Sequence, residues 1–175
     1  EPAVPDSESE ELKAAAVQAV NTALDNLIAM RNKEGAELEK DLRGRIDLLK
    51  QFLEKIKPLA AGVPTALKQN LIEKITAENL PVDTNDERLL KEVLLYADKS
   101  DITEEITRLE SHFRQFDGFL AASEPVGRSL DFLLQEMFRE ITTLGNKAGS
   151  SDITPIVVAF KSELEKIREQ VQNIE

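Results

Sequence analysis

The amino-acid sequence predicts an all-α protein made of one very long helix and a bundle of about five further helices. Good helix formers, chiefly Leu, Glu, Lys, Ala, Gln and Arg, dominate long stretches of the chain. Only seven glycines and seven prolines are present, which leaves few turn residues for a fold with many strands. Apolar residues recur at intervals of three and four, the period of a helix with one buried face.

The composition also excludes several classes of protein. The chain has 175 residues and 41% hydrophobic residues, enough for a core, and no cysteine, which excludes disulfides, thiolate metal sites and cysteine nucleophiles. No run approaches the roughly 20 apolar residues of a membrane span, so we expect no membrane partner. The net charge of −11 argues against a surface that is basic everywhere, so any RNA has to meet a local basic site or a metal ion.

The chain is expected to have three parts. Residues 1–10 are acidic, contain prolines and show no apolar period, which predicts a mobile lead-in. Residues 11–83 are predicted to hold the long helix and a helical hairpin, and residues 84–175 a C-terminal helical domain. The start lacks an initiator methionine and a signal core, so we interpret the chain as part of a longer protein.

The first helix is predicted over residues 10–59, where Pro58 is expected to end it. At 1.5 Å per residue such a helix spans roughly 70 Å, more than a small globule can cover. Other helices or another subunit must therefore bury its apolar stripe, which predicts an oligomer. The stripe consists of Val17, Val20, Leu24, Leu27, Leu38, Leu42, Ile46, Leu49, Leu53 and Ile56.

Two shorter helices are predicted over residues 65–78 and 85–98. The first follows the turn at residues 62–65, and residues 80–84 separate the two because Pro81 breaks the pattern. Leu89, Val93 and Tyr96 are expected to share the apolar side of the second.

Three further helices complete the prediction. The helix over residues 101–121 begins with Asp101 and Glu104 at the spacing of a capping box. The next, over residues 124–147, is expected to use Ser123 as N-cap, and Gly145 and Gly149 are expected to mark its end. The last runs from residue 152 or 155 to residue 173, with apolar residues at three-four spacing.

One polar stripe on the helix of residues 101–121 carries charges of both signs. Asp101, Glu105, Arg108 and His112 fall at offsets that place them on one face. A solvated face with ion pairs inside the helix explains this pattern as well as a ligand site does.

The following helix carries a pair of glutamates outside its apolar face. Glu136 and Glu140 lie one turn apart, with Cβ atoms about 6 Å from each other, close enough for both carboxylates to hold one hard divalent cation. The same spacing suits ordinary solvated glutamates, so spacing alone does not identify a metal site.

The residues of this helix carry a family resemblance. The run from Val126 to Glu140, followed by Thr143-Leu144-Gly145 and Lys147, resembles the C-terminal signature of the YicC/YloC family of bacterial endoribonucleases. The segment 101–112, the Arg31-x-x-Glu34-Gly35-x-x-Leu38 element and the chain's ending resemble the same family, from about Val20 onward.

Three departures from the family pattern accompany the resemblance. Phe138 stands where the family commonly has Asn, and Asn146 where it commonly has Ser. The family's N-terminal domain is absent from these residues, so part of an active site lies outside them if that domain contributes to it.

The resemblance implies metal-dependent cleavage of single-stranded RNA by a cytoplasmic homo-oligomer, expected to be a hexamer. The divalent metal cation would be Mn²⁺ or Mg²⁺, because the candidate ligands are mainly oxygen. The implied metal ligands are His112, Glu105, Glu136 and Glu140, and the implied catalytic residues are Glu136, Glu140 and Asp131. The implied RNA-phosphate ligands are Arg108, Arg128, Arg139 and Lys147.

Two alternatives stay open within the family. The same polar groups also suit a buried ion-pair network that fixes two helices in register. The chain as a whole also suits a non-catalytic helical module for oligomerisation and RNA clamping. An unrelated coiled-coil scaffold is disfavoured by the signature, and no Gly-rich phosphate loop or HExxH pattern supports another enzyme class.

Overall fold

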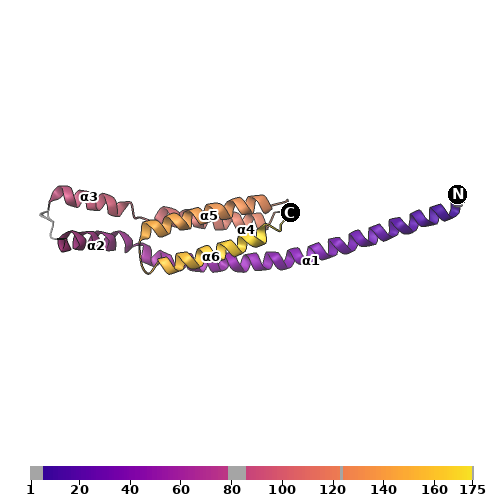
Figure 1. Ribbon diagram of the computed structural model, residues 1–175, viewed down its shortest axis with the longest axis horizontal. Coiled ribbons are helices and arrows are strands. Elements are labelled where there is room, and N and C mark those ends of the chain that lie inside the picture. Colours follow the sequence, from indigo (N-terminus) through magenta and orange to yellow (C-terminus); the bar gives the residue numbers. More distant parts are fainter. Residues whose placement is uncertain (1–5, 79–85, 123, 175) are drawn as a thin grey trace. The chain divides into compact units, whose positions relative to one another are not determined.

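The computed structural model describes residues 6–78, 86–122 and 124–174, and these residues form helices and no strand (Figure 1). This confirms the predicted all-α class with one very long helix. The helices are α1 (Asp6–Ala60), α2 (Val63–Ala77), α3 (Glu87–Asp98), α4 (Thr103–Leu120), α5 (Gly127–Ala148) and α6 (Thr154–Val171). Among the described helices, none combines the length and apolar content that crossing a membrane requires.

The chain divides into two compact units within α1, Glu1–Asp41 and Leu42–Glu175. In the first unit, all described side chains from residue 10 to residue 37 are exposed. The exposed apolar residues Val17, Val20, Leu24 and Leu27 form what we call the N-terminal stripe. α1 already begins at Asp6, inside the predicted lead-in, while residues 1–5 and the predicted boundary at 83/84 lie outside the described residues.

The core of the second unit joins the end of α1 to α4, α5 and α6. Leu42, Ile46, Leu49, Leu53 and Ile56 follow one another at four-three spacing and are at most 1% exposed, as the sequence predicts for this stretch. Figure 1 shows α4, α5 and α6 running alongside this part of α1. The buried apolar side chains of these three helices are Ile106, Leu109, Phe113, Phe116, Leu130, Leu133, Leu134, Met137, Ile141, Leu144, Ala148, Val157, Phe160, Leu164, Ile167 and Val171.

Ion pairs connect the helices around this core. Arg45 of α1 donates to Glu163 of α6 with a distance of 2.6 Å, although the two residues are 118 positions apart. Lys50 of α1 reaches Asp117 of α4 at 3.0 Å. The buried Glu163 also accepts from Lys166 at 3.0 Å, so two cations compensate its burial.

Two predicted helix ends are wrong. Pro58 lies inside α1, which continues to Ala60, because the fixed φ of proline suits a helix and costs only one hydrogen bond in this last turn. α5 begins at Gly127 rather than at residue 124, and its N-cap Val126 provides no side-chain hydrogen bond. Gly127 instead touches the end of the chain, since a Cβ there would lie 2.3 Å from the carbonyl oxygen of Ile174.

Other local predictions have mixed outcomes. The Asp101 side chain accepts a hydrogen bond from the backbone N–H of Thr103 at 2.8 Å, but the predicted capping box is wrong, because the N-cap of α4 is Ile102 and Glu104 pairs with Arg108. Gly149 ends α5 in a left-handed conformation with φ of 51°, as predicted, whereas Gly145 lies inside the helix and does not mark its end. The prediction for Tyr96 is wrong, because α3 buries Val93 and Ala97 at a spacing of four and leaves Tyr96 55% exposed.

Candidate functional site

A cluster of polar side chains lies where α4 packs on α5, and we call it the α4–α5 cluster. Helical periodicity gathers its members, because residues separated by four or seven positions share one face of each helix. The cluster consists of Glu104, Glu105, Arg108 and His112 of α4 and Glu136, Glu140 and Lys147 of α5.

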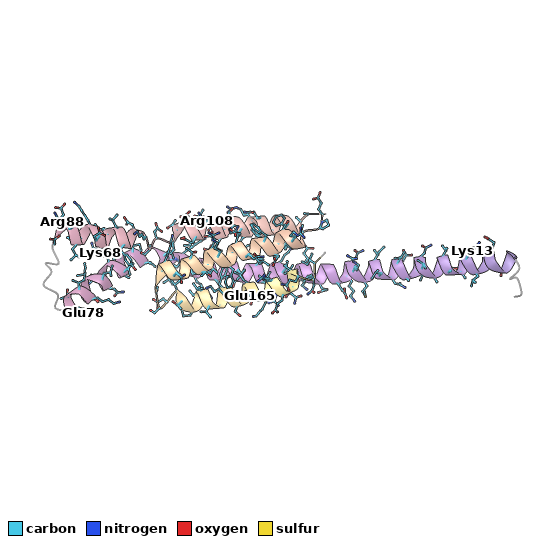
Figure 2. The ribbon with its side chains drawn as sticks, turned by 45° about the horizontal axis from the view of Figure 1, so that its top comes forward. Lys13, Lys68, Glu78, Arg88, Arg108 and Glu165 are labelled. Atoms are coloured by element: carbon cyan, nitrogen blue, oxygen red, sulfur yellow. The ribbon has the colours of Figure 1, made fainter. Side chains whose placement is uncertain are left out.

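Arg108 bridges the two helices. Its Nη1 lies 3.1 Å from Oε1 of Glu140 on α5, and its Nη2 lies 2.5 Å from Oε1 of Glu104 on α4. Glu140 is only 7% exposed at its side chain, whereas Arg108, labelled in Figure 2, remains half exposed. The hydrogen bond to Glu140 is the main reason that the pKa of Arg108 is raised above its ordinary value. Arg108 therefore neutralises a buried carboxylate.

Lys147 forms a second bridge with another buried carboxylate. Its Nζ lies 2.7 Å from Oε1 of Glu105, whose side chain is 4% exposed. This hydrogen bond raises the pKa of Lys147. The other carboxylate oxygen of Glu105 is buried and has no hydrogen-bond partner among the described residues.

His112 is half-buried, and the charges of two carboxylates act on its imidazole. Burial lowers its pKa, while the charges of Glu140 and Glu136 act in the opposite direction and Arg108 lowers it further. At neutral pH the imidazole is therefore neutral. Its Nδ1 is buried and has no hydrogen-bond partner in the described part of the chain. A buried ring nitrogen normally has a partner, so this atom marks a place for water, an ion or a ligand atom.

The predicted metal ligands are only partly brought together. The charges of Glu136 and Glu140 act on His112, but Glu140 is paired with Arg108 and Glu105 with Lys147. Within residues 6–78, 86–122 and 124–174, no three His, Asp or Glu side chains form a group that could hold a metal ion by themselves. The described residues supply a partial set of donors of the right chemical type.

Asp131 lies away from the α4–α5 cluster. It is nine residues from Glu140, which at 100° per residue places it on the opposite side of α5. There its carboxylate accepts from Nε of Arg168 at 3.1 Å and from the amide of Gln135 at 2.7 Å. The structure thus associates Asp131 with α6 and not with Glu136 and Glu140.

The four predicted phosphate ligands fall into two classes. Arg108 and Lys147 are held in ion pairs with buried glutamates. Arg128 and Arg139 are exposed on α5, and neither forms an ion pair with any residue that the structure describes. Arg128 and Arg139 are therefore the more accessible of the four cations.

Sequence reasoning missed the buried carboxylate of Glu163. Burial opposes its charge, but hydrogen bonds from Lys166 and Arg45 lower its pKa overall. The available signal is its position three residues after Phe160, on the apolar side of α6.

Comparisons with known proteins cover most of the chain. A family model described as "Endoribonuclease YicC-like, C-terminal" matches residues 54–175. A protein of Clostridioides difficile strain 630, named probable endoribonuclease YicC, is 45% identical over 161 residues, which are 90% of this chain and 54% of that protein. A protein of the same name from Haemophilus influenzae is 33% identical over 178 residues, 99% of this chain and 61% of that protein. The chain thus spans only about half to three-fifths of the length of these relatives.

Proposed function

The chain belongs to the YicC-like endoribonuclease family, and on that premise we propose that it is the C-terminal part of an enzyme that cleaves phosphodiester bonds of RNA. The observation that supports this most is the buried, unpartnered Nδ1 of His112, an imidazole on which the charges of Glu136 and Glu140 act. Groups of this kind, held in place by packing, are typical of sites that bind a reacting ligand.

The finer proposal is that cleavage depends on Mn²⁺ or Mg²⁺ and acts on single-stranded RNA. Magnesium-like ions usually keep several waters and bind through one or two carboxylates together with substrate phosphates, so a partial protein donor set suits them. His112, Glu136 and Glu140 would hold the ion. When bound, a divalent cation neutralises phosphate charge and lowers the pKa of water.

The remaining residues of the cluster have positioning roles in this proposal. Arg108 fixes the carboxylate of Glu140 through the 3.1 Å hydrogen bond, and Lys147 holds Glu105 and thereby the register of α4 on α5. Arg128 and Arg139 would bind RNA phosphates, because they are the exposed arginines of α5 without an ion pair to a described residue. Asp131 acts indirectly, by orienting Arg168 and Gln135.

Assembly and location belong to the same proposal. The N-terminal stripe exposes Val17, Val20, Leu24 and Leu27 in the single chain, which supports burial against other subunits of a homo-oligomer, with a hexamer as the expected size. A cysteine-free chain that acts on RNA suits the cytoplasm.

The second candidate function is a non-catalytic helical module for oligomerisation and RNA clamping. The observation in its favour is that Arg108 and Lys147 neutralise the buried Glu140 and Glu105, as a structural ion-pair network would. The chemistry would then lie in the part of the relatives that this chain does not span.

Substitution of Glu136 and Glu140 distinguishes the endoribonuclease from the non-catalytic clamping module. In a protein of the relatives' length that carries this chain, Glu136→Gln and Glu140→Gln should each reduce Mn²⁺-dependent cleavage of single-stranded RNA about tenfold or more and alter the melting temperature much less. The amide keeps the shape but loses the negative charge that a hard cation needs. Glu169→Gln, on the exposed side of α6, is the matched control.

Two further measurements complete the test. Mn²⁺ should broaden the NMR signals of His112, the only histidine of the chain, and this broadening should weaken in Glu136→Gln. Arg128→Ala and Arg139→Ala should instead weaken RNA binding and reduce its salt dependence by about one phosphate contact each. Full activity of both glutamine variants would favour the clamping module.

A further inference from the structure

A pocket lies on the side of α5 that faces α6. Phe138 is two residues from Glu140, a rotation of about 200° around the helix axis, so its ring lies away from the α4–α5 cluster. The ring lines a pocket of about 170 Å³ between the two helices. The lining residues are Leu134, Gln135, Phe138, Leu164, Glu165 and Arg168.

The aromatic wall of this pocket is accessible and carries a cation. Phe138 is 36% exposed, and Nζ of Lys161 lies 5.3 Å from its ring centroid. An ammonium over the face of a ring is attracted by the ring's electrons, which holds a positive charge beside Phe138. Arg139, the next residue of α5, adds an exposed guanidinium on the outer side.

The polar wall is held in place by Asp131. Its carboxylate accepts from Arg168 and from the amide nitrogen of Gln135, so both side chains are fixed at the pocket. The remaining N–H groups of Arg168 and the carbonyl oxygen of Gln135 are left to contact a ligand. Glu165 of α6, labelled in Figure 2, adds an exposed carboxylate that accepts hydrogen bonds.

We propose that this pocket binds one unpaired nucleobase of an RNA strand, stacked on Phe138 and contacted at its edge by Gln135 and Arg168. The inference depends on one part of the proposed function, namely that RNA reaches α5. A flat heterocycle matches a small pocket with an aromatic wall and both donors and acceptors, whereas Glu165 would repel a phosphate there. An aliphatic side chain would make no hydrogen bond to the remaining N–H groups of Arg168 or to the carbonyl oxygen of Gln135. Lys161 and Arg139 flank the pocket for the neighbouring phosphates.

A tryptophan placed in the pocket reports directly on stacking, because the chain contains none. In Phe138→Trp, a single-stranded RNA of about ten nucleotides should quench the fluorescence, and a chain of the same length with abasic sugars in place of the bases should not. Tyr96→Trp, an exposed aromatic position on α3, is the control and should respond to neither.

The possible results separate this inference from the proposed function. If the RNA binds, as fluorescence anisotropy shows, but leaves the fluorescence of the Phe138→Trp variant unchanged, or if the abasic chain quenches it equally, the pocket assignment is wrong and the RNA function stands. If a nucleoside monophosphate quenches and RNA does not, the pocket belongs to a small nucleotide instead. If no RNA binds at all, both proposals fail.

Two conservative variants test the contribution of the ring. Phe138→Leu keeps an apolar side chain but removes the flat face, and should raise the Kd for the RNA about 5- to 150-fold, the range for one base stacked on an aromatic side chain. Phe138→Tyr keeps the face and should retain the affinity. Equal affinity in Phe138→Leu, with unchanged melting, would overturn the inference.

Discussion

Lys147 of α5 reaches the buried carboxylate of Glu105 on α4, with Nζ 2.7 Å from Oε1 of a side chain that is 4% exposed. Lys147→Met keeps the length of the side chain but leaves Glu105 buried without this cation. We expect a loss of about 1–3 kcal/mol in the free energy of unfolding, nearer the lower end because water reaches Lys147. Urea denaturation measures this loss.

A matched control comes from an exposed ion pair. Lys91 and Glu87 lie 2.7 Å apart on α3, with 68% and 82% of their side chains exposed. Lys91→Met should change stability by no more than about 0.5 kcal/mol. Adding Glu105→Gln to Lys147→Met should restore part of the lost stability, because the uncompensated charge is removed. No rescue in the double variant would contradict this account.

Two glycines of the second unit should respond to alanine in opposite directions. A Cβ at Gly127 would lie 2.3 Å from the backbone oxygen of Ile174, so Gly127→Ala must displace the end of the chain from α5. The expected cost is about 1–3 kcal/mol. A Cβ at Gly44 meets no atom within 4 Å, so Gly44→Ala should stabilise α1 by up to about 1 kcal/mol. Thermal melts of both variants measure these changes. Equal shifts of the two melting temperatures, in sign and size, would refute the prediction.

Glu163 should make stability depend on pH in the acidic range. Its folded-state pKa is lowered, because the hydrogen bonds from Lys166 and Arg45 outweigh its burial. A lowered folded pKa means that the stabilisation is fully present above the unfolded value of about 4.3 and is lost as the pH falls through the folded value. The stability of the protein relative to Glu163→Gln should therefore be constant from about pH 7 to about pH 5 and then decrease.

Urea midpoints between about pH 3 and pH 7 measure this dependence, with Glu169→Gln as an exposed control on the same helix. If the difference in stability between the protein and Glu163→Gln stays constant from about pH 3 to pH 7, Arg45 and Lys166 do not hold the Glu163 carboxylate in the charged form.

Local patterns are sufficient to predict the helices and most of their buried faces. The three-four spacing of Leu134, Met137 and Ile141 predicts the core side of α5, and all three are buried. The predictions for Tyr96 and Pro58 are wrong because a local pattern does not show which of two acceptable faces is buried, or how much one lost hydrogen bond matters in a terminal turn.

The candidate site could be predicted only one helix at a time. Spacing places Glu105, Arg108 and His112 on one face of α4, but it does not show that Glu105 pairs with Lys147 rather than sharing a site with His112. That choice depends on the rotation and register of α4 against α5. Asp131 shows the same limit, because its partner Arg168 is 37 residues away on α6.

The hydrogen bond between Arg45 and Glu163 also constrains how the protein is made. A ribosome adds about 5–20 residues per second, so the 118 residues between them take roughly 6–24 seconds to appear. Until then the face of α1 that carries Leu42, Ile46 and Leu49 has no α6 to pack against. During this time the apolar face of α1 stays only partly covered, and we expect this segment to need shielding by a chaperone until α6 leaves the ribosome.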